Sequence, residues 1–219
     1  MTNLALALRM EPTLSTLLRR LVIMGGSYDQ VGNTTAVAEW NISVDQEAAD
    51  QVFRAWSAEN LEPQHLPILC GLDLTRTVAI TPEILARLAG AAGSTTTTMS
   101  VQDERGTRST ASNPLIRVIE DAIRFYMEAI ATTGTVIWHT CTTRWRRQSR
   151  WTPDLVATRA GRVDVELART LTRGMTVTDW PGRREPNARI GIRVHSAAFF
   201  DRFIERVGPF ARWVGAAVE

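Results

Sequence analysis

The fold is decided by the stretch Leu21-Val22-Ile23-Met24-Gly25-Gly26, in which four apolar residues are closed by two glycines. A second run of this kind, Leu66-Pro67-Ile68-Leu69-Cys70, is closed by Gly71. Short apolar runs bounded by turn residues are typical of buried parallel strands. A loop and a helical pattern follow each run, so the sequence predicts alternating strand and helix units.

Helix start signals lie between and after these runs. Asp45 can cap a helix that runs through Ala48, Ala49, Val52 and Phe53. The stretch Thr81-Pro82-Glu83 combines a capping hydroxyl, a proline and an acidic residue. We expect Gly90 to end that second helix. Ser112 is expected to open a long amphipathic helix, and a last helix is expected from about Ser196.

The later part of the chain alternates at the period of a strand over residues 162–167, 175–178 and 190–194. The pattern as a whole predicts an α/β domain, with a mainly parallel open sheet flanked by helices, over residues 1–219. The threonine-rich stretch 91–111 is predicted to be a mobile surface loop.

The composition excludes several classes of protein. With 44% hydrophobic and 22% charged residues, the chain is neither disordered nor collagen-like. No apolar run approaches 18 residues, which argues against a membrane span. Cys70 and Cys141 form no CxxC motif, so we expect no disulfide framework and no zinc site, and we expect a cytoplasmic protein. Two of the three histidines, His65 and His195, are expected to be surface or packing residues.

All 25 basic residues are arginine, and the net charge of +2 comes from one short window without acidic residues between Glu128 and Asp154. Arginine interleaved with tryptophan is found on surfaces that bind single-stranded nucleic acid, whereas a solvated loop is the simpler interpretation. The window contains Trp138, Arg144, Trp145, Arg146, Arg147, Arg150 and Trp151.

A dense polar constellation follows the first apolar run. Asn33, Glu39 and Asn41 would leave the carboxyl end of a parallel strand, where open sheets bind ligands. Their donors and acceptors suit vicinal hydroxyls such as those of a sugar. The alternative is a loop that caps itself, with Asn33 holding a turn and Glu39 paired with an arginine.

Several stretches resemble the inosine-uridine nucleoside hydrolases. The likeness is strongest in the first fifty residues and continues through Gly71-Leu72-Asp73-Leu74-Thr75, residues 163–167 and residues 171–175. The resemblance implies a nucleoside hydrolase-like α/β fold that hydrolyses the N-glycosidic bond of nucleosides, with a calcium ion that holds the attacking water. It also implies that Met24, Asn33, Glu39 and Asn41 contact the ribose.

Other family motifs do not match. The family's aspartate-rich calcium motif, DxDxGxDD, would precede this chain, so we expect a domain that lacks the first strands and has not retained calcium. A family HDP motif is expected in the arginine-tryptophan window, where Trp138-His139-Thr140-Cys141 stands instead. Read from the third base of the Cys141 codon with GC-ending codons, a shifted frame can spell HDPLAAAVALDP. We therefore hypothesise that roughly residues 131–152 are translated out of frame.

These observations leave two main hypotheses. The first is a nucleoside N-ribohydrolase family member of weak or no activity, with no catalytic or metal residue of its own identified. The second is a non-catalytic nucleoside-binding or interaction protein. The shifted frame disfavours a nucleic-acid partner. We expect a small-molecule nucleoside as ligand, no membrane partner and, as the resemblance implies, a homo-oligomer.

Overall fold

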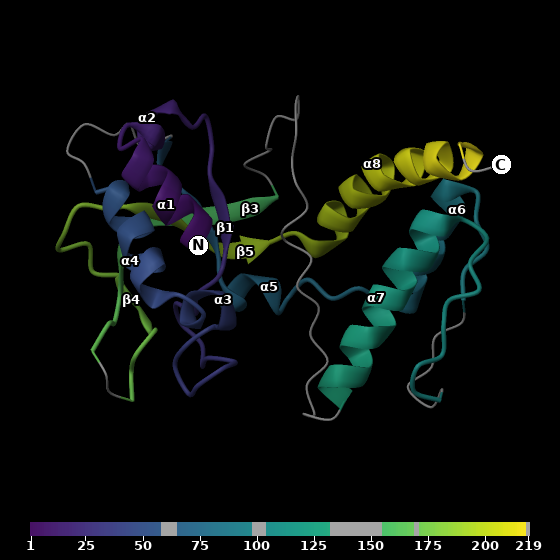
Figure 1. Cartoon of the computed structure of the whole chain (residues 1–219), viewed down its shortest axis with the longest axis horizontal. Coiled ribbons are helices and arrows are strands. Elements are labelled where there is room, and N and C mark those ends of the chain that lie inside the picture. The colour runs from purple at the N-terminus through teal and green to yellow at the C-terminus, as the bar shows by residue number, and fades with distance from the viewer. Residues whose placement is uncertain (58–64, 98–103, 132–154, 169–170, 218–219) are drawn as a thin grey trace. The chain divides into compact units, whose positions relative to one another are not determined.

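The computed structural model describes residues 1–57, 65–97, 104–131, 155–168 and 171–217. The chain divides into two compact units. Unit 1 comprises Met1–Thr77 and His139–Val194, and unit 2 comprises Val78–Trp138 and His195–Glu219. Figure 1 labels their elements. Of the hypothesised out-of-frame segment, residues 131–152, the structure describes only residue 131. The arginine-tryptophan window lies outside the described residues.

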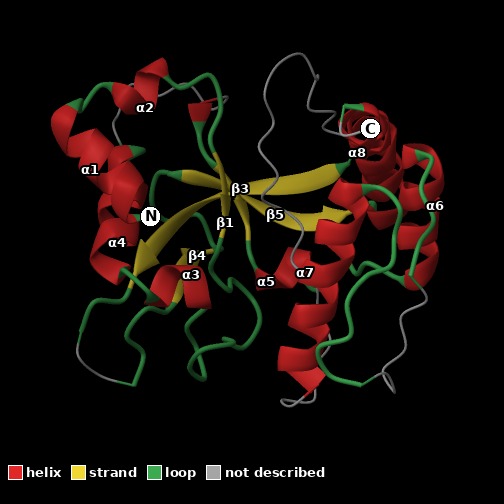
Figure 2. Ribbon diagram, turned by 45° about the vertical axis from the view of Figure 1, so that its right-hand side comes forward, coloured by secondary structure: helices red, strands yellow, loops and turns green. Residues whose placement is uncertain are grey.

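Unit 1 contains a five-stranded sheet of order β1-β2-β5-β3-β4 (Figure 2). The strands β1, β2 and β5 pair in parallel, whereas β3 pairs antiparallel with both β5 and β4. The apolar runs of β1 and β2 align residue by residue, with Ile23 opposite Leu69. The strands span Val22–Met24 (β1), Ile68–Cys70 (β2), Val156–Val165 (β3), Thr176–Asp179 (β4) and Ala188–Val194 (β5).

The helices of unit 1 cover this sheet. Helix α1 packs on α4, and α4 packs on β3 (Figure 2). Phe53 and Trp56 at the end of α4 are almost completely buried in one core with Ile190 of β5. Burial of large apolar side chains of this kind is the main stabilising contribution to such a unit. The helices span Thr2–Met10 (α1), Leu14–Leu17 (α2), Trp40–Ser43 (α3), Gln46–Ala55 (α4) and Leu72–Thr75 (α5).

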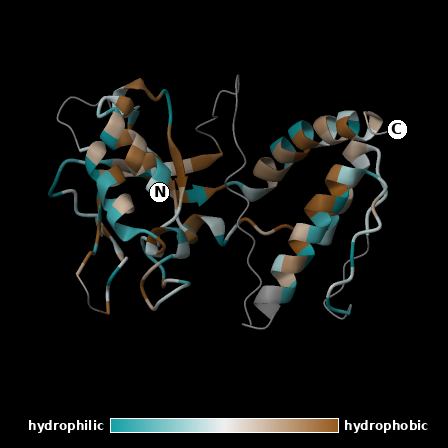
Figure 3. Ribbon diagram, viewed as in Figure 1, coloured by the Kyte–Doolittle hydropathy of each residue, from teal (hydrophilic) through white to brown (hydrophobic). Residues whose placement is uncertain are grey.

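Unit 2 is built from α6 (Pro82–Ala92), α7 (Pro114–Ala131) and α8 (Ser196–Ala216). Their apolar faces, which Figure 3 shows in brown along α7 and α8, form a separate core. Gly208 of α8 lies so close to Ala91 of α6 that a Cβ atom on Gly208 would stand 2.5 Å from the Ala91 Cβ. No helix among the described residues combines the length and hydrophobicity that a membrane crossing requires.

The predicted α/β class is confirmed, and the sheet is mixed because its last two pairings are antiparallel. The helix ends differ from the predictions by a few residues. Helix α6 continues through Gly90 and ends at Gly93, whose φ of +68° favours glycine. Helix α7 begins after Asn113, whose side chain accepts from the N–H of Ile116, and not at Ser112. His195 caps α8 by accepting from the N–H of Ala198 at 3.2 Å.

The expected loop over residues 91–111 is partly ordered by hydrogen bonds in unit 2. Ala91 and Ala92 belong to α6, and residues 94–97 pair with residues 109–112 through their hydroxyl groups. Thr95 and Ser112 exchange two bonds, since each backbone N–H donates to the other's hydroxyl, at 3.1 and 2.9 Å. We call this side-chain pairing the hydroxyl ladder. The mobility of the loop stays a prediction.

A buried carboxylate holds the hydroxyl ladder to α7. Glu120 is 1% exposed and accepts from the hydroxyls of Thr96 and Ser109, both at 2.5 Å, and from the N–H of Thr97. A buried carboxylate is tolerated only when its oxygens receive several hydrogen bonds. The ladder therefore supplies the donors that this position on α7 requires.

The close approach of Tyr28 to Gly71 predicts a specific packing effect. A Cβ atom on Gly71 would lie 2.5 Å from Cε2 of the buried Tyr28 ring, so Gly71→Ala forces a shift in the core of unit 1. We expect a loss of about 1–3 kcal/mol in the free energy of unfolding, measured by urea denaturation. Gly90→Ala is the control, because nothing lies within 4 Å of its Cβ position and alanine favours the helix. Equal stability of the two variants would contradict this packing.

The cap of α4 predicts a dependence of stability on pH. Hydrogen bonds from the Thr2 hydroxyl and the Ala48 N–H lower the pKa of the Asp45 carboxyl below its usual value. A carboxyl whose pKa is lower in the folded state stabilises the fold above the unfolded-state pKa, about 3.9. That contribution is lost as the pH falls through the folded-state pKa.

Asp45→Asn keeps a good cap but removes this titration. We expect the free energy of unfolding of this variant to fall less steeply with acid than that of the wild type. Urea denaturation at a series of acidic pH values measures this. The exposed Asp29, replaced by asparagine, serves as the matched control. Parallel curves for the wild type and Asp45→Asn would refute the contribution.

Candidate functional site

The loop that leaves the carboxyl end of β1 carries the predicted site in unit 1. Gly26 has a φ of +83°, and a Cβ atom there would stand 2.6 Å from the hydroxyl of Tyr28. Glycine is therefore required on both conformational and steric grounds. The chain turns sharply here, beside Gly71 at the end of the neighbouring parallel strand β2, where the N–H of Leu72 donates to the Gly26 carbonyl.

Glu39 anchors this loop from inside. The side chain is 2% exposed, and its Oε2 accepts from the N–H of Gly26 at 3.0 Å and from that of Ile42 at 3.1 Å. The second bond makes Glu39 the N-cap of α3. One carboxylate oxygen thus joins the turn after β1 to the start of the next helix.

Asn41 and Met24 lie next to this carboxylate. The Asn41 side-chain amide donates to Sδ of Met24 at 2.9 Å, and it lies 3.4 Å from the Met24 carbonyl oxygen. A Cβ atom on Gly25 would lie 3.3 Å from Glu39 Oε2 and 3.5 Å from Cβ of Asn41. Three of the four predicted ribose residues are therefore in one cluster at the end of β1.

Asn33 joins the cluster from the other side of the loop. Its Oδ1 accepts from the N–H of Trp40 at 2.9 Å, directly between Glu39 and Asn41 in the chain. Asn33 and Asn41 are exposed, Met24 is half-buried and Glu39 is buried. The structure thus brings together all four residues that the sequence singled out.

The alternative of a self-capping loop describes part of these contacts. Asn33 does hold a turn, through its bond with the Trp40 N–H. The described bonds of Glu39 go to backbone N–H groups and not to the arginine that this alternative expected. The loop is therefore internally bonded, which orders it before any ligand arrives.

Asp73 is a second anchor that sequence reasoning did not identify. Its two oxygens accept from the N–H groups of Tyr28, at 2.7 Å, and Asp29, at 2.8 Å. In the sequence, the stretch Gly71-Leu72-Asp73-Leu74-Thr75 stands out only through the family resemblance. The contact joins residues 45 positions apart, and a local pattern does not show such a pairing.

Tyr28 fills the space between these anchors. Its hydroxyl donates to the Gly25 carbonyl at 2.9 Å. Burial raises the pKa of the Tyr28 phenol well above its usual value, and the nearby Cys70, Glu39 and Asp73 add to this effect. The phenol therefore stays protonated and keeps its donor role over the ordinary pH range.

Strand β4 closes the loop from a third direction. The Thr176 hydroxyl accepts from the Ser27 N–H at 3.0 Å and donates to the Ser27 carbonyl at 2.7 Å. This pair joins residues 149 positions apart. Glu39, Asp73 and Thr176 together fix the backbone from Gly26 to Asp29.

The described part of the chain brings no three His, Cys, Asp or Glu side chains close enough to hold a metal ion. That this chain has not retained calcium stays a prediction.

Comparison with known proteins identifies one family. The family described as inosine-uridine preferring nucleoside hydrolase matches residues 1–201. The pyrimidine-specific ribonucleoside hydrolase RihA of Shewanella woodyi is 29% identical over 97% of this chain and 60% of its own length. The inosine-uridine preferring nucleoside hydrolase of Leishmania major is 30% identical over 95% of this chain and 58% of its own length.

Solved structures agree with this fold. The purine-preferring ribonucleoside hydrolase from Gardnerella vaginalis superposes with a TM-score of 0.70 at 23% identity, over 96% of this chain and 58% of that one. A plant nucleoside hydrolase superposes with a TM-score of 0.64 at 20% identity, over 94% and 59%. The chain spans about three fifths of the length of these relatives.

The role of Asp73 as an anchor is testable by Asp73→Asn. The amide keeps one acceptor but points a donor at one of the two N–H groups, so a backbone donor loses its partner. We expect a loss of about 1.5–3 kcal/mol in the free energy of unfolding. We also expect faster hydrogen exchange at the amides of Tyr28 and Asp29. Asp29→Asn, which changes an exposed carboxyl in the same loop, is the control. Unchanged exchange in Asp73→Asn would show that the anchor is not needed.

Proposed function

The chain belongs to the inosine-uridine preferring nucleoside hydrolase family, and on that basis we propose that the loop after β1 binds the ribose of a nucleoside through Met24, Asn33, Glu39 and Asn41. The observation that carries this proposal is the buried carboxylate of Glu39 at the carboxyl end of a parallel strand. Such ends are where open α/β sheets bind their ligands. The ligand is a purine or pyrimidine ribonucleoside, and the reaction class is hydrolysis of its N-glycosidic bond.

The hydrogen bonds within the loop support a match to hydroxyl groups. Among the described residues, Glu39 uses Oε2 for its two backbone bonds, which leaves Oε1 as an acceptor. Asn33 uses Oδ1 and keeps its NH₂ group as a donor. Asn41 uses its NH₂ group and keeps Oδ1 as an acceptor. Two acceptors and one donor suit ribose hydroxyls, which both donate and accept.

The same carboxylate would favour the chemistry of the family. Hydrolysis of a glycosidic bond passes through an oxocarbenium-like state in which the sugar becomes positively charged. A fixed negative charge beside the sugar, shielded from water by burial, stabilises that state more than it would in solvent. Glu39 has this position and burial if ribose occupies the loop.

The residues described here supply the part of the site that holds the sugar. Activation of water and protonation of the leaving base need further groups, and we infer that this chain lacks groups for these two roles. We therefore propose that this chain binds nucleoside and releases base slowly or not at all. Binding without any base release would favour the second hypothesis, a non-catalytic nucleoside-binding protein.

Asn41→Ala tests the ribose contacts. Removal of the amide loses one hydrogen bond to the sugar and the contact that positions Met24. We expect the dissociation constants for inosine and uridine, measured by isothermal titration calorimetry, to rise about tenfold. Asn3→Ala is the matched control, because Asn3 is exposed on α1. Base release is followed in parallel by chromatography.

The outcomes of this experiment are distinct. Equal affinity of Asn41→Ala and the wild type would refute the ribose assignment, and rapid base release by the wild type would refute the proposal of weak turnover. Titrations in calcium and in a chelator test whether nucleoside affinity depends on the ion. We expect the same affinity in both, and a calcium-dependent affinity would show that the ion is retained.

A further inference from the structure

Met24 brings a thioether to the loop after β1, and the proposed function uses it only as a contact for ribose. Side chains alternate along β1, so that Ile23 is buried whereas Val22 is exposed and Met24 is half-buried. The Met24 side chain therefore leaves the sheet on its more open face. Its Sδ accepts from the amide of the exposed Asn41 at 2.9 Å, so small solutes can reach this bonded pair.

The sulfur of Met24 has a reactivity that its hydrogen bond does not use. A thioether is a weak acceptor, and one of its lone pairs stays free when the other accepts from Asn41. The free lone pair can attack hydrogen peroxide and form a bond to one of its oxygens as the O–O bond breaks. The other oxygen leaves with both hydrogens as water. The sulfur is oxidised by two electrons to a sulfoxide, and the peroxide is reduced.

Oxidation would change the acceptor that Asn41 contacts. The sulfoxide oxygen is more polar than the sulfur and projects beyond it, so we expect the Asn41 NH₂ group to follow this oxygen. Because the side-chain amide is planar, Oδ1 of Asn41 moves together with the NH₂ group. In the proposed function this Oδ1 is the acceptor that Asn41 keeps for a ribose hydroxyl. The added oxygen also takes up space beside the sugar.

We propose that Met24 is an oxidative modification site, at which a peroxide converts the thioether to a sulfoxide and thereby weakens nucleoside binding by the loop after β1. The inference rests on the proposed function, because it takes the Asn41 Oδ1 as a ribose contact. The change is reversible, since methionine sulfoxide reductases restore the thioether.

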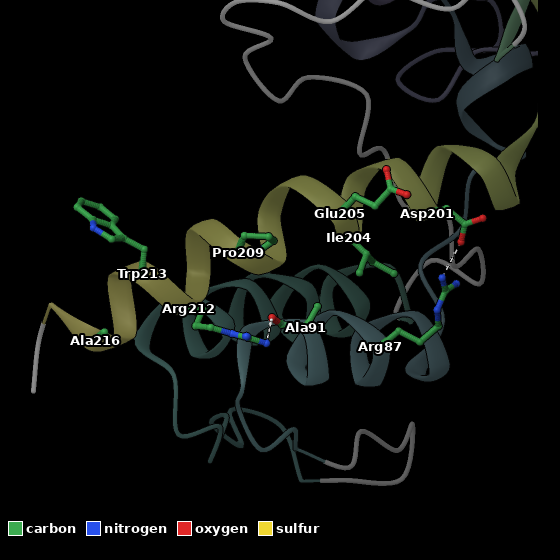
Figure 4. A pocket seen from close by; sticks show the side chains of 9 residues that line it. All are labelled: Arg87, Ala91, Asp201, Ile204, Glu205, Pro209, Arg212, Trp213 and Ala216. Carbon is green, nitrogen blue, oxygen red and sulfur yellow. Dashed lines mark hydrogen bonds and ion pairs between the residues drawn. The ribbon is translucent and has the colours of Figure 1, made fainter.

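A groove in unit 2 provides a comparison. It lies between α6 and α8, and its volume of about 730 Å³ is large enough for a nucleoside (Figure 4). Arg87 and Asp201 form an ion pair at one end, and Arg212 donates to the Ala91 carbonyl at 2.9 Å. None of the nine residues that line the groove carries sulfur. Peroxide would therefore not affect a nucleoside bound in the groove, whereas it would affect one bound at the loop.

Treatment of the full chain with hydrogen peroxide tests this site. Catalase then removes the peroxide, dithiothreitol reduces any oxidised cysteine, and peptide mass spectrometry locates the sulfoxides. Isothermal titration calorimetry measures the affinity for inosine and uridine. We expect oxidation of Met24 to raise the dissociation constants of the wild type about tenfold, and methionine sulfoxide reductases to restore them.

Two variants assign the effect to one sulfur. Met24→Leu keeps a side chain of similar volume without the sulfur. Whatever the affinity of this variant before treatment, we expect peroxide to leave that affinity unchanged. Met10→Leu is the matched control, because Met10 is 80% exposed on α1. We expect its affinity to fall on oxidation as that of the wild type does.

The side-chain NH₂ signals of Asn41 in NMR spectra report the modification without a nucleoside. We expect a sulfoxide at Met24 to shift these signals and to leave those of the exposed Asn3 in place. If the untreated chain binds no nucleoside, the proposed function fails, and the Asn41 signals alone decide this inference. A chain with Met10 oxidised and Met24 unmodified would overturn it. So would an oxidised Met24 that leaves the Asn41 signals or the measured affinity unchanged.

Discussion

The site depends on how the backbone N–H groups after β1 are satisfied. The chain turns there through glycines and a short loop, so the usual partners in a helix or sheet are missing, and buried donors without partners are costly. Two carboxylates solve this problem. Glu39 takes the N–H groups of Gly26 and Ile42, and Asp73 takes those of Tyr28 and Asp29. The loop is therefore held by side chains from two directions, and its shape is fixed without regular secondary structure.

In the proposed function, this arrangement gives the polar residues two simultaneous roles. Asn33 uses its Oδ1 and Asn41 uses its NH₂ group in bonds within the loop. The other half of each amide is available to a ligand. Binding groups that are already oriented lose little conformational entropy when the ligand arrives, which favours affinity. The bonds within the loop and sugar recognition are therefore compatible interpretations of the same residues. In the proposed function, the loop's own bonds prepare the ribose site.

Local patterns were enough to predict much of this fold. The apolar runs at β1 and β2, the Asp45 cap and the Thr81-Pro82 start all depend on neighbouring residues, and the structure has each of them. The direction of β3 and β4 was not predictable, because alternation at period 2 is the same for either direction. Gly90 was a plausible helix end, but no backbone requirement for glycine arises until Gly93. Asp73 was missed because its partners lie far away in the sequence.

The hydroxyl ladder of unit 2 shows that a stretch of repetitive composition can still require a particular side chain at each position. Each Ser or Thr of residues 94–97 forms a hydrogen bond with a different group. The four residues are therefore not interchangeable, although three of them are threonine. Valine has the shape of threonine, but its methyl group would remove the hydroxyl that Thr96 donates to the buried Glu120 carboxylate. At Thr95 and Thr97 it would remove the acceptors for the N–H groups of Ser112 and Thr110. Mutational tolerance in such a stretch should therefore follow the pattern of bonds, and a composition-based measure of sequence complexity would misjudge it.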